Sequence, residues 1–129
     1  MAFAEWDQSC SVGIQLIDNQ HKRLFVLISD FHEAKTNLDQ VLQDLLSYID
    51  FHFKTEEKYF EEFGYQDQED HKGQHLFYES KVREFFKQLL QGNNRIEEEV
   101  ENFVRDWIVR HIKVTDKEYQ KCFNEHGLK

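Results

Sequence analysis

The chain has 129 residues, of which 40% are hydrophobic and twelve are phenylalanine, enough for one folded domain with a sizeable core and not typical of disorder. The absence of proline and the presence of only five glycines favour helices joined by short turns. A formal net charge of −9 opposes binding to nucleic acid or to an anionic membrane, so neither is expected as a partner.

Three features bear on the compartment of the protein. The two cysteines, Cys10 and Cys122, are too few for a disulfide framework and are expected to be free thiols. No apolar run approaches the ~20 residues of a membrane-spanning helix. The first residues, MAFAEWDQ, are acidic and lack the basic start of a signal peptide. We therefore expect a cytoplasmic protein.

The N-terminal half predicts an arm and two helices. Residues 1–17 show no helical period and are interrupted by Gly13, which indicates an extended arm packed on the body. A first helix is predicted over residues 18–36, with Asp18 as its N-cap. A second helix is predicted over residues 39–63, and Gly64 is placed to end it.

The C-terminal half predicts two further helices, over residues 68–90 and 95–125. Gly92-Asn93-Asn94 separates them, and Gly127 follows the last one. Four amphipathic segments with short connections predict an all-α fold, an antiparallel up-down-up-down four-helix bundle. The whole chain, 1–129, is then one domain, with 1–17 as its arm.

Polar residues interrupt the apolar stripes of all four predicted helices. They are His21, His52-x-x-x-Glu56, His71-x-x-x-His75 and His111-x-x-x-x-Asp116, in helix order. A buried imidazole or carboxylate is costly unless it is paired or binds a metal. In an up-down bundle, the starts of the first and third helices share an end with the finishes of the second and fourth. All seven side chains are therefore expected at one level, as metal ligands.

The number of candidate ligands indicates two metal ions. Seven ligands are too many for one ion of usual coordination. Two octahedral ions have about twelve positions, which five imidazoles, two bridging carboxylates and one bridging oxygen fill except for one. Mixed imidazole and carboxylate ligands suit iron, with manganese or zinc as alternatives. An open position beside a second redox-active iron is what reversible O2 capture needs.

These motifs resemble those of the hemerythrin family in order and spacing, and the resemblance extends over essentially the whole chain. The arm with Trp6 and the C-terminal ending resemble those of single-domain bacteriohemerythrins. Similar segments include Asn19-Gln20-His21, residues 52–57 (HFKTEE) and residues 105–111 (RDWIVRH). The resemblance implies that His71, His75 and His111 hold one iron and that His21 and His52 hold the other, which keeps the open position. Glu56 and Asp116 would bridge the irons, together with an oxo or hydroxo group.

The function that the resemblance implies is O2 storage, delivery or scavenging, without catalysis. The diferrous form would bind O2 end-on and reduce it to a hydroperoxide, reversibly. Nitric oxide or small anions are possible ligands of the open iron. A sensing module for O2, nitric oxide or redox state is the alternative, and a di-iron oxidase or peroxidase is a further one. Trp107 and Ile108, one turn before His111, are candidates to line the O2 pocket as well as to pack in the core.

Three other polar residues are expected outside the ligand set. His32 lies three helical turns from His21, about 16 Å along the axis, and is expected to be structural or partly exposed. Glu57 is turned about 100° from Glu56 and is interpreted as a solvated neighbour. His126, beside Gly127, is expected at the surface.

The spacing of the last two candidate ligands predicts an irregular backbone. His111 and Asp116 are five residues apart, which places them about 140° apart on a regular α-helix. One extra residue in a turn, as in a π-bulge, would restore a shared face. We therefore expect irregular backbone hydrogen bonding between Ile112 and Asp116.

Overall fold

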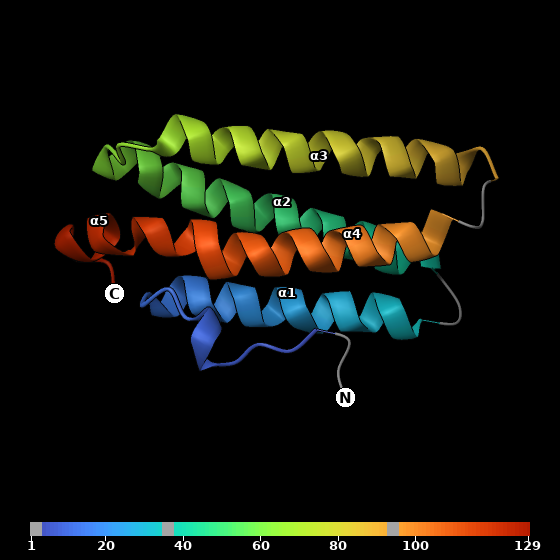
Figure 1. Cartoon of the computed structure of the whole chain (residues 1–129), viewed down its shortest axis with the longest axis horizontal. Helices are drawn as coiled ribbons and strands as arrows, with labels where there is room; N and C mark the ends of the chain where they lie inside the picture. The colour runs from blue at the N-terminus through green and yellow to red at the C-terminus, as the bar shows by residue number, and fades with distance from the viewer. Residues whose placement is uncertain (1–3, 35–37, 93–95) are drawn as a thin grey trace.

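A computed structural model of the chain describes residues 4–34, 38–92 and 96–129. It is an antiparallel bundle of four long helical stretches, with all four running along the longest axis of the molecule (Figure 1). The long helices are α1 (Gln15–Glu33), α2 (Leu38–Phe63), α3 (Gln68–Leu90) and α4 (Ile96–Arg110). None of the described residues forms a strand. The predicted all-α, up-down-up-down bundle is confirmed.

The fourth helical stretch changes its winding after α4. A π-helical turn, η2 (His111–Thr115), is followed by a 3-10 turn, η3 (Asp116–Tyr119), and by the short α5 (Gln120–Glu125). The expected irregularity between Ile112 and Asp116 is therefore confirmed. Helix α1 ends at Glu33, three residues before the predicted limit, because Ala34 is extended. The predicted start at residue 95 and the predicted turn residues Asn93 and Asn94 lie outside the described part of the chain.

The predicted N-cap of the first helix was wrong. Helix α1 begins at Gln15, and its N-cap residue, Ile14, forms no side-chain cap bond. Asp18 lies inside the first turn, where its carboxylate accepts hydrogen bonds from the Val12 backbone N–H (2.8 Å) and the Ser11 hydroxyl (2.6 Å). Its side chain fixes the arm to the helix rather than starting the helix.

The arm is shorter and less extended than the predicted 1–17. It contains a 3-10 turn, η1 (Gln8–Cys10), and its Ala4 exchanges two hydrogen bonds with the Ser29 hydroxyl of α1. Gly13 has a φ of +71°, and a Cβ there would lie 2.1 Å from the Gln120 side-chain nitrogen, so a larger residue fits poorly. The predicted end of the second helix is confirmed, because Gly64 has a φ of +63° and the Tyr65 N–H donates to the Phe60 carbonyl.

Two apolar clusters form the core. The larger one packs all four helices together over most of the bundle length and includes Phe25, Leu45, Phe53 and Val104. The smaller one joins the arm, the end of α2 and the C-terminal segment, at Ile14, Phe60, Tyr119 and Phe123. The seven predicted metal ligands lie near the junction of the two clusters.

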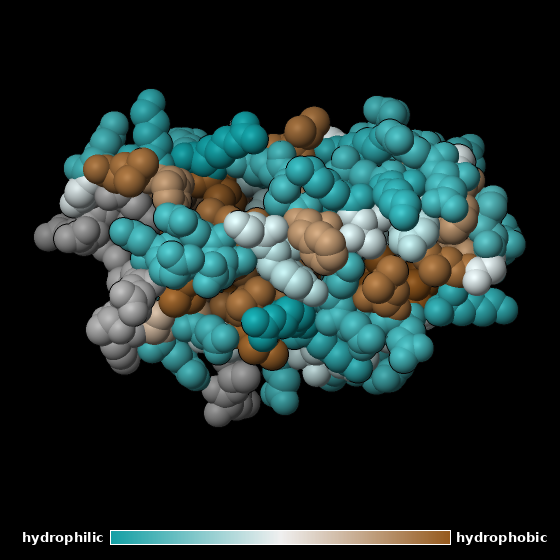
Figure 2. Space-filling view, turned by 180° about the vertical axis from the view of Figure 1, so that it is seen from behind, coloured by the Kyte–Doolittle hydropathy of each residue, from teal (hydrophilic) through white to brown (hydrophobic). Residues whose placement is uncertain are grey.

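The outer surface is largely hydrophilic, with small separate apolar areas on the face seen in Figure 2. No helix among the described residues is long and apolar enough to cross a membrane. Cys10 is buried, Cys122 is half-buried, and both are free thiols as expected.

Candidate metal centre

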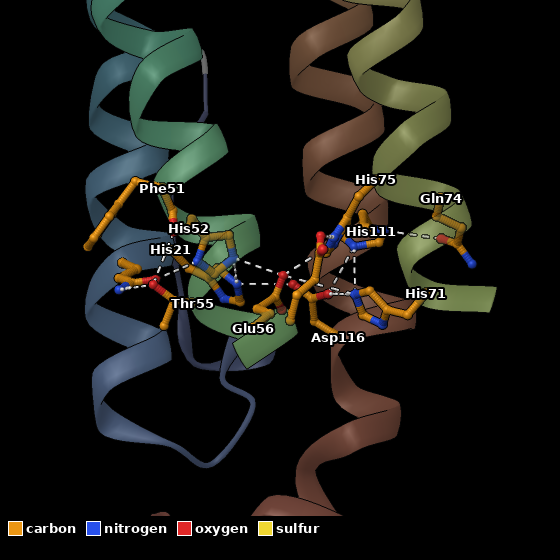
Figure 3. Close-up of polar contacts among 12 residues, drawn as sticks. His21, Phe51, His52, Thr55, Glu56, His71, Gln74, His75, His111 and Asp116 are labelled. Atoms are coloured by element: carbon orange, nitrogen blue, oxygen red, sulfur yellow. Dashed lines mark hydrogen bonds and ion pairs between the residues drawn. The ribbon is translucent and has the colours of Figure 1, made fainter. Parts of the chain in front are cut away.

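The seven side chains predicted as ligands meet in the interior of the bundle. Each of them is between 0% and 4% exposed. In Figure 3, His21 and His52 project from α1 and α2 on one side, and His71, His75 and His111 project from α3 and η2 on the other. The carboxylates Glu56 and Asp116 lie between these two groups. The structure thus brings together all seven of the predicted residues.

The histidines on α3 and η2 point their Nε2 atoms toward a common point. His71 Nε2 lies 3.1 Å from His111 Nε2, and Asp116 Oδ1 lies 3.0 Å from each of them. His75 Nε2 lies 3.3 Å from Glu56 Oε1. One ligand atom from each of Glu56, His71, His75 and His111 falls within 4.8 Å of the others.

A second convergence involves α1 and α2. His21 Nε2 lies 3.0 Å from His52 Nε2 and 3.0 Å from Asp116 Oδ2. Glu56 Oε1 lies 3.4 Å from His52 Nε2. The ligand atoms of His21, His52, Glu56 and Asp116 also fall within 4.8 Å of one another. Asp116 therefore faces one group with each of its two carboxylate oxygens, and Glu56 belongs to both groups.

The cluster fits metal ions better than it fits hydrogen bonding within the protein. Both oxygens of Glu56 and both oxygens of Asp116 are buried without a hydrogen-bond partner among the described residues. Such atoms are expensive to bury unless a cation satisfies them. Two atoms that bind one ion at a right angle, each about 2.1 Å from it, lie about 3.0 Å from one another. The Nε2 atoms of His21 and His52, and those of His71 and His111, have about this separation.

Three further residues contact the histidines at Nδ1, the ring nitrogen that faces away from the cluster. His52 Nδ1 lies 2.6 Å from Gln20 Oε1, His75 Nδ1 lies 2.9 Å from Glu57 Oε2, and His111 Nδ1 lies 3.1 Å from Gln74 Oε1. Oxygen acceptors at Nδ1 place the ring proton there and leave the Nε2 lone pair free for a metal.

The interpretation of Glu57 as a solvated neighbour was therefore wrong. Its side chain is 33% exposed, but its carboxylate reaches across to α3 and contacts His75. Gln20 and Gln74 were not singled out from the sequence. Their acceptor roles link different helices, and no local motif signals such a contact. An amide one residue before His21 and another one residue before His75 were the only available hints.

Comparison with known proteins decides the family. A family model described as hemerythrin HHE cation binding domain matches residues 12–123. The chain belongs to the hemerythrin family. The bacteriohemerythrin of Pseudomonas aeruginosa is 32% identical over 124 residues, which cover 92% of this chain and 80% of that protein. The bacteriohemerythrin of Methylococcus capsulatus is 28% identical over 130 residues, covering 96% and 99%.

Solved structures agree with the assignment. A crystal structure of wild-type hemerythrin superposes with a TM-score of 0.87 at 30% identity, covering 94% of this chain and 98% of that one. The cluster of histidines and carboxylates in this hemerythrin domain is compatible with a di-iron site.

The surroundings of the histidines differ on the two sides of the hemerythrin site. Burial lowers the pKa of His52 to about 4, because desolvation outweighs the attraction of Glu56. Burial also disfavours protonation of His75, but the Glu56 and Glu57 carboxylates outweigh it and raise its pKa to about 9. The two sides of the hemerythrin site therefore shift the histidine pKa in opposite directions.

The two central carboxylates stay ionised. Burial by itself would raise the pKa of Asp116, yet His111, His21 and His71 hold it well below its usual value. Burial and the nearby Asp116 also oppose ionisation of Glu56, but His52 and His75 lower its pKa. The hemerythrin site thus offers two negative charges in its centre, which suits divalent or trivalent cations.

The π-turn orients the last two candidate ligands. Residues five apart share a face where the backbone follows i to i+5 hydrogen bonding, and the N–H of Asp116 donates to the His111 carbonyl. The Gln74 side-chain oxygen accepts from both His111 Nδ1 and the Thr115 hydroxyl, each at 3.1 Å. One amide of α3 thus holds the first and the last residue of the turn.

Aromatic and aliphatic side chains surround the ligands. Phe53 stacks on His75 with ring centroids 3.8 Å apart, and Trp107 stacks on His111 at 4.4 Å. Ile108 is 1% exposed and belongs to the larger apolar cluster. His32 lies outside the site, with an exposed side chain 3.0 Å from Glu101, and His126 is exposed as expected.

Proposed function

We propose that this hemerythrin domain binds O2 reversibly at a non-haem di-iron site, for storage, delivery or scavenging of oxygen. The observation that carries the proposal is the double convergence of ligand atoms. Two sets of four ligand atoms share Glu56, and all of the residues that supply them are buried. His71, His75 and His111 would hold one iron, and His21 and His52 would hold the other. Glu56 and Asp116 would bridge the two.

The unequal number of imidazoles supports an open position on one iron. Three histidines converge on the side of α3 and η2, whereas two converge on the side of α1 and α2. The bound irons would supply the two electrons that O2 accepts on binding and would recover them on release, with an oxo or hydroxo group between them. The open position would lie on the side of His21 and His52.

The protein's own residues would keep this chemistry reversible. Gln20, Glu57 and Gln74 hold the Nδ1 protons, so the rings stay oriented with Nε2 toward the ions. The bridging carboxylates offset part of the cationic charge. Ile108, in the larger apolar cluster, and Trp107, stacked on His111, would form part of an apolar wall that excludes water and external protons from the ligand.

The first experiment is elemental analysis combined with optical spectroscopy. We expect close to two irons per chain and an absorption change that appears with O2 and reverses when O2 is removed. One metal per chain, or mainly zinc after expression in iron-replete medium, would contradict the di-iron assignment. Rapid and continuous O2 consumption with a reductant would indicate an oxidase instead of a carrier.

A pair of variants tests the ligand set. His21→Ala removes a proposed ligand of the O2-binding iron, so we expect loss of O2 binding. His32→Ala removes a histidine of the same helix that contacts Glu101 at the surface, so O2 binding should stay near normal. Loss of binding in a folded His32→Ala variant would show that the choice of ligand on α1 is wrong.

A further inference from the structure

The two groups of imidazoles differ in the contacts behind their rings. We name each group by its first helix: the α3 position consists of His71, His75 and His111, and the α1 position consists of His21 and His52. At the α3 position, His75 Nδ1 lies 2.9 Å from a Glu57 oxygen. His111 Nδ1 lies 3.1 Å from Gln74 Oε1, and His71 Nδ1 is buried without a partner among the described residues. Two of these three rings thus have an acceptor, and one acceptor is negatively charged.

The α1 position has fewer outer contacts, and they are neutral. His52 Nδ1 lies 2.6 Å from Gln20 Oε1, an amide oxygen. The Gln20 side chain is itself held, because its nitrogen donates to the Thr55 hydroxyl of α2 at 3.4 Å. His21 Nδ1 is buried, and no described residue partners it. Of the two rings at the α1 position, only His52 therefore has an acceptor, and that acceptor carries no charge.

The central carboxylates do not offset this difference. Asp116 Oδ1 lies 3.0 Å from the Nε2 atoms of His71 and His111. The other oxygen of Asp116 lies 3.0 Å from His21 Nε2, and Glu56 belongs to both groups of ligand atoms. The α3 position is therefore offered three imidazoles and two carboxylates, whereas the α1 position is offered two imidazoles and the same two carboxylates.

These contacts favour a metal ion at the α3 position. An acceptor at Nδ1 orients the ring and strengthens Nε2 as a ligand, and its loss typically lowers metal affinity by about 10–100-fold. The charge of Glu57 attracts a cation more strongly than a neutral amide does. That charge also attracts a proton to His75, but its Coulomb attraction for a divalent ion is about twice as large. The third imidazole adds a further ligand in the same direction.

We propose that the two metal positions fill in a fixed order, the α3 position first and the α1 position second, and that the neutral Gln20 keeps the second ion exchangeable. The inference rests on the proposed function, because it concerns the same two ions. Since the α1 position is the one to which we assign O2 binding, the ion that binds O2 is the one that leaves first. Gln20 is a positioning residue, because it acts on that ion through His52.

The test removes metal stepwise from the full chain loaded with two Zn2+ ions, which are redox-inert and diamagnetic. Competition with a chelator should show two steps, with the α3 position at least about tenfold tighter. Repulsion between the two ions also separates the steps, so the rings that respond must be identified. In nitrogen-15 NMR, the ring signals of the α1 position should change with loss of the first ion. Those of the α3 position should change only with loss of the second.

Two variants of Gln20 should shift the weaker position in opposite directions. Gln20→Glu gives His52 a charged acceptor like that of His75, so the α1 position should hold Zn2+ about tenfold more tightly. Gln20→Leu removes the acceptor and should weaken the same position about tenfold. Gln15→Glu makes the same change of charge at an exposed place on α1 and should alter either step less than about twofold. Unchanged affinity of the α3 position in each variant shows that the bundle is intact.

Three results would overturn the proposed order. They are simultaneous change of all five histidine ring signals, earlier loss of the ion at the α3 position, and equal effects of Gln20→Glu and Gln15→Glu on the α1 position. Failure of the proposed function would look different. A wild type that releases two Zn2+ ions in the expected order but binds no O2 once it is loaded with iron would contradict O2 binding and leave the order intact.

Discussion

Glu57 illustrates how a residue next to a candidate ligand can act through another helix. It follows Glu56 in α2, but its carboxylate contacts His75 Nδ1 of α3 at 2.9 Å. A carboxylate at this position makes the ring a stronger donor than an amide would, and loss of such an outer contact typically lowers metal affinity by about 10–100-fold. The three histidines with outer partners are therefore unequal, since His52 and His111 have glutamine instead.

The first prediction concerns this charge. Glu57→Gln keeps a hydrogen-bond acceptor but removes the negative charge, so we expect iron affinity to fall by about tenfold. Competition with a chelator measures the change. Glu62→Gln, on the exposed face of α2, has the same chemistry and should leave the affinity unchanged. Equal iron affinities of Glu57→Gln and the wild type would show that the charge of Glu57 does not contribute to metal binding.

The second prediction concerns the apolar wall. Ile108→Ala opens space beside the site, so water and protons should reach bound O2 faster and autoxidation should accelerate. The variant should also lose about 2–4 kcal/mol of unfolding free energy. Ile28→Ala creates a similar cavity two turns beyond His21, and it should lose stability without faster autoxidation. Decay of the oxygenated spectrum and urea unfolding measure the two effects, and equal autoxidation in both variants would place Ile108 outside the pocket.

At the scale of elements, the π-turn depends on a contact from α3. The Gln74 side-chain oxygen bonds to His111 and to Thr115, which are the first and last residues of the turn. No proline occurs in the chain to force the irregular winding. The turn is therefore stabilised by side-chain contacts and, once ions bind, by coordination.

The third prediction tests this contact. Gln74→Leu removes both hydrogen bonds, so we expect amide exchange in residues 112–116 to accelerate and unfolding free energy to fall by about 1–3 kcal/mol. Thr115→Val removes only the second bond and should have a smaller effect on both. Hydrogen exchange of the metal-free protein measures the turn directly. Unchanged exchange in Gln74→Leu would mean that packing alone holds the turn.

Elements also show what the sequence could predict. The period of the apolar residues predicts α2 and α3 nearly to their limits, and the five-residue spacing of His111 and Asp116 predicts the irregular turn. The start of α1 was misplaced because an aspartate in a first turn resembles an N-cap, and only the tertiary contacts of Asp18 with the arm distinguish the two. Glu57, Gln20 and Gln74 were missed for a similar reason, since their partners lie on other helices.

At the scale of the whole molecule, a buried polar layer separates two apolar clusters. Four carboxylate oxygens in this layer have no hydrogen-bond partner among the described residues. Without a cation, only the neighbouring imidazoles offset the burial of these carboxylates, whereas bound ions would turn the same groups into a cross-link of all four helical stretches.

The fourth prediction follows from this layer. Removal of the metal ions should lower the melting temperature by about 10 °C or more, and iron should restore it. Thermal unfolding with and without chelator measures the shift. His32→Ala should show the same shift as the wild type, while His71→Ala should show a much smaller one. A metal-free protein as stable as the loaded one would contradict the role of the ions in folding.

The winding after α4 has a consequence for engineering. A π-turn rotates the chain about the helix axis by a smaller angle per residue than an α-helix does, and a 3-10 turn rotates it by a larger angle. Five π-helical residues therefore lag behind a regular helix, and four 3-10 residues run ahead of it, each by roughly the rotation of one residue. The two deviations cancel, and Tyr119 and Phe123 continue the buried stripe of Ile108 and Ile112 as though the helix were straight. Residues 111–119 therefore leave the rotational phase of the flanking helix unchanged. Together with an acceptor such as Gln74 on the neighbouring helix, they could be transplanted into another bundle without rotating the side chains on either flank.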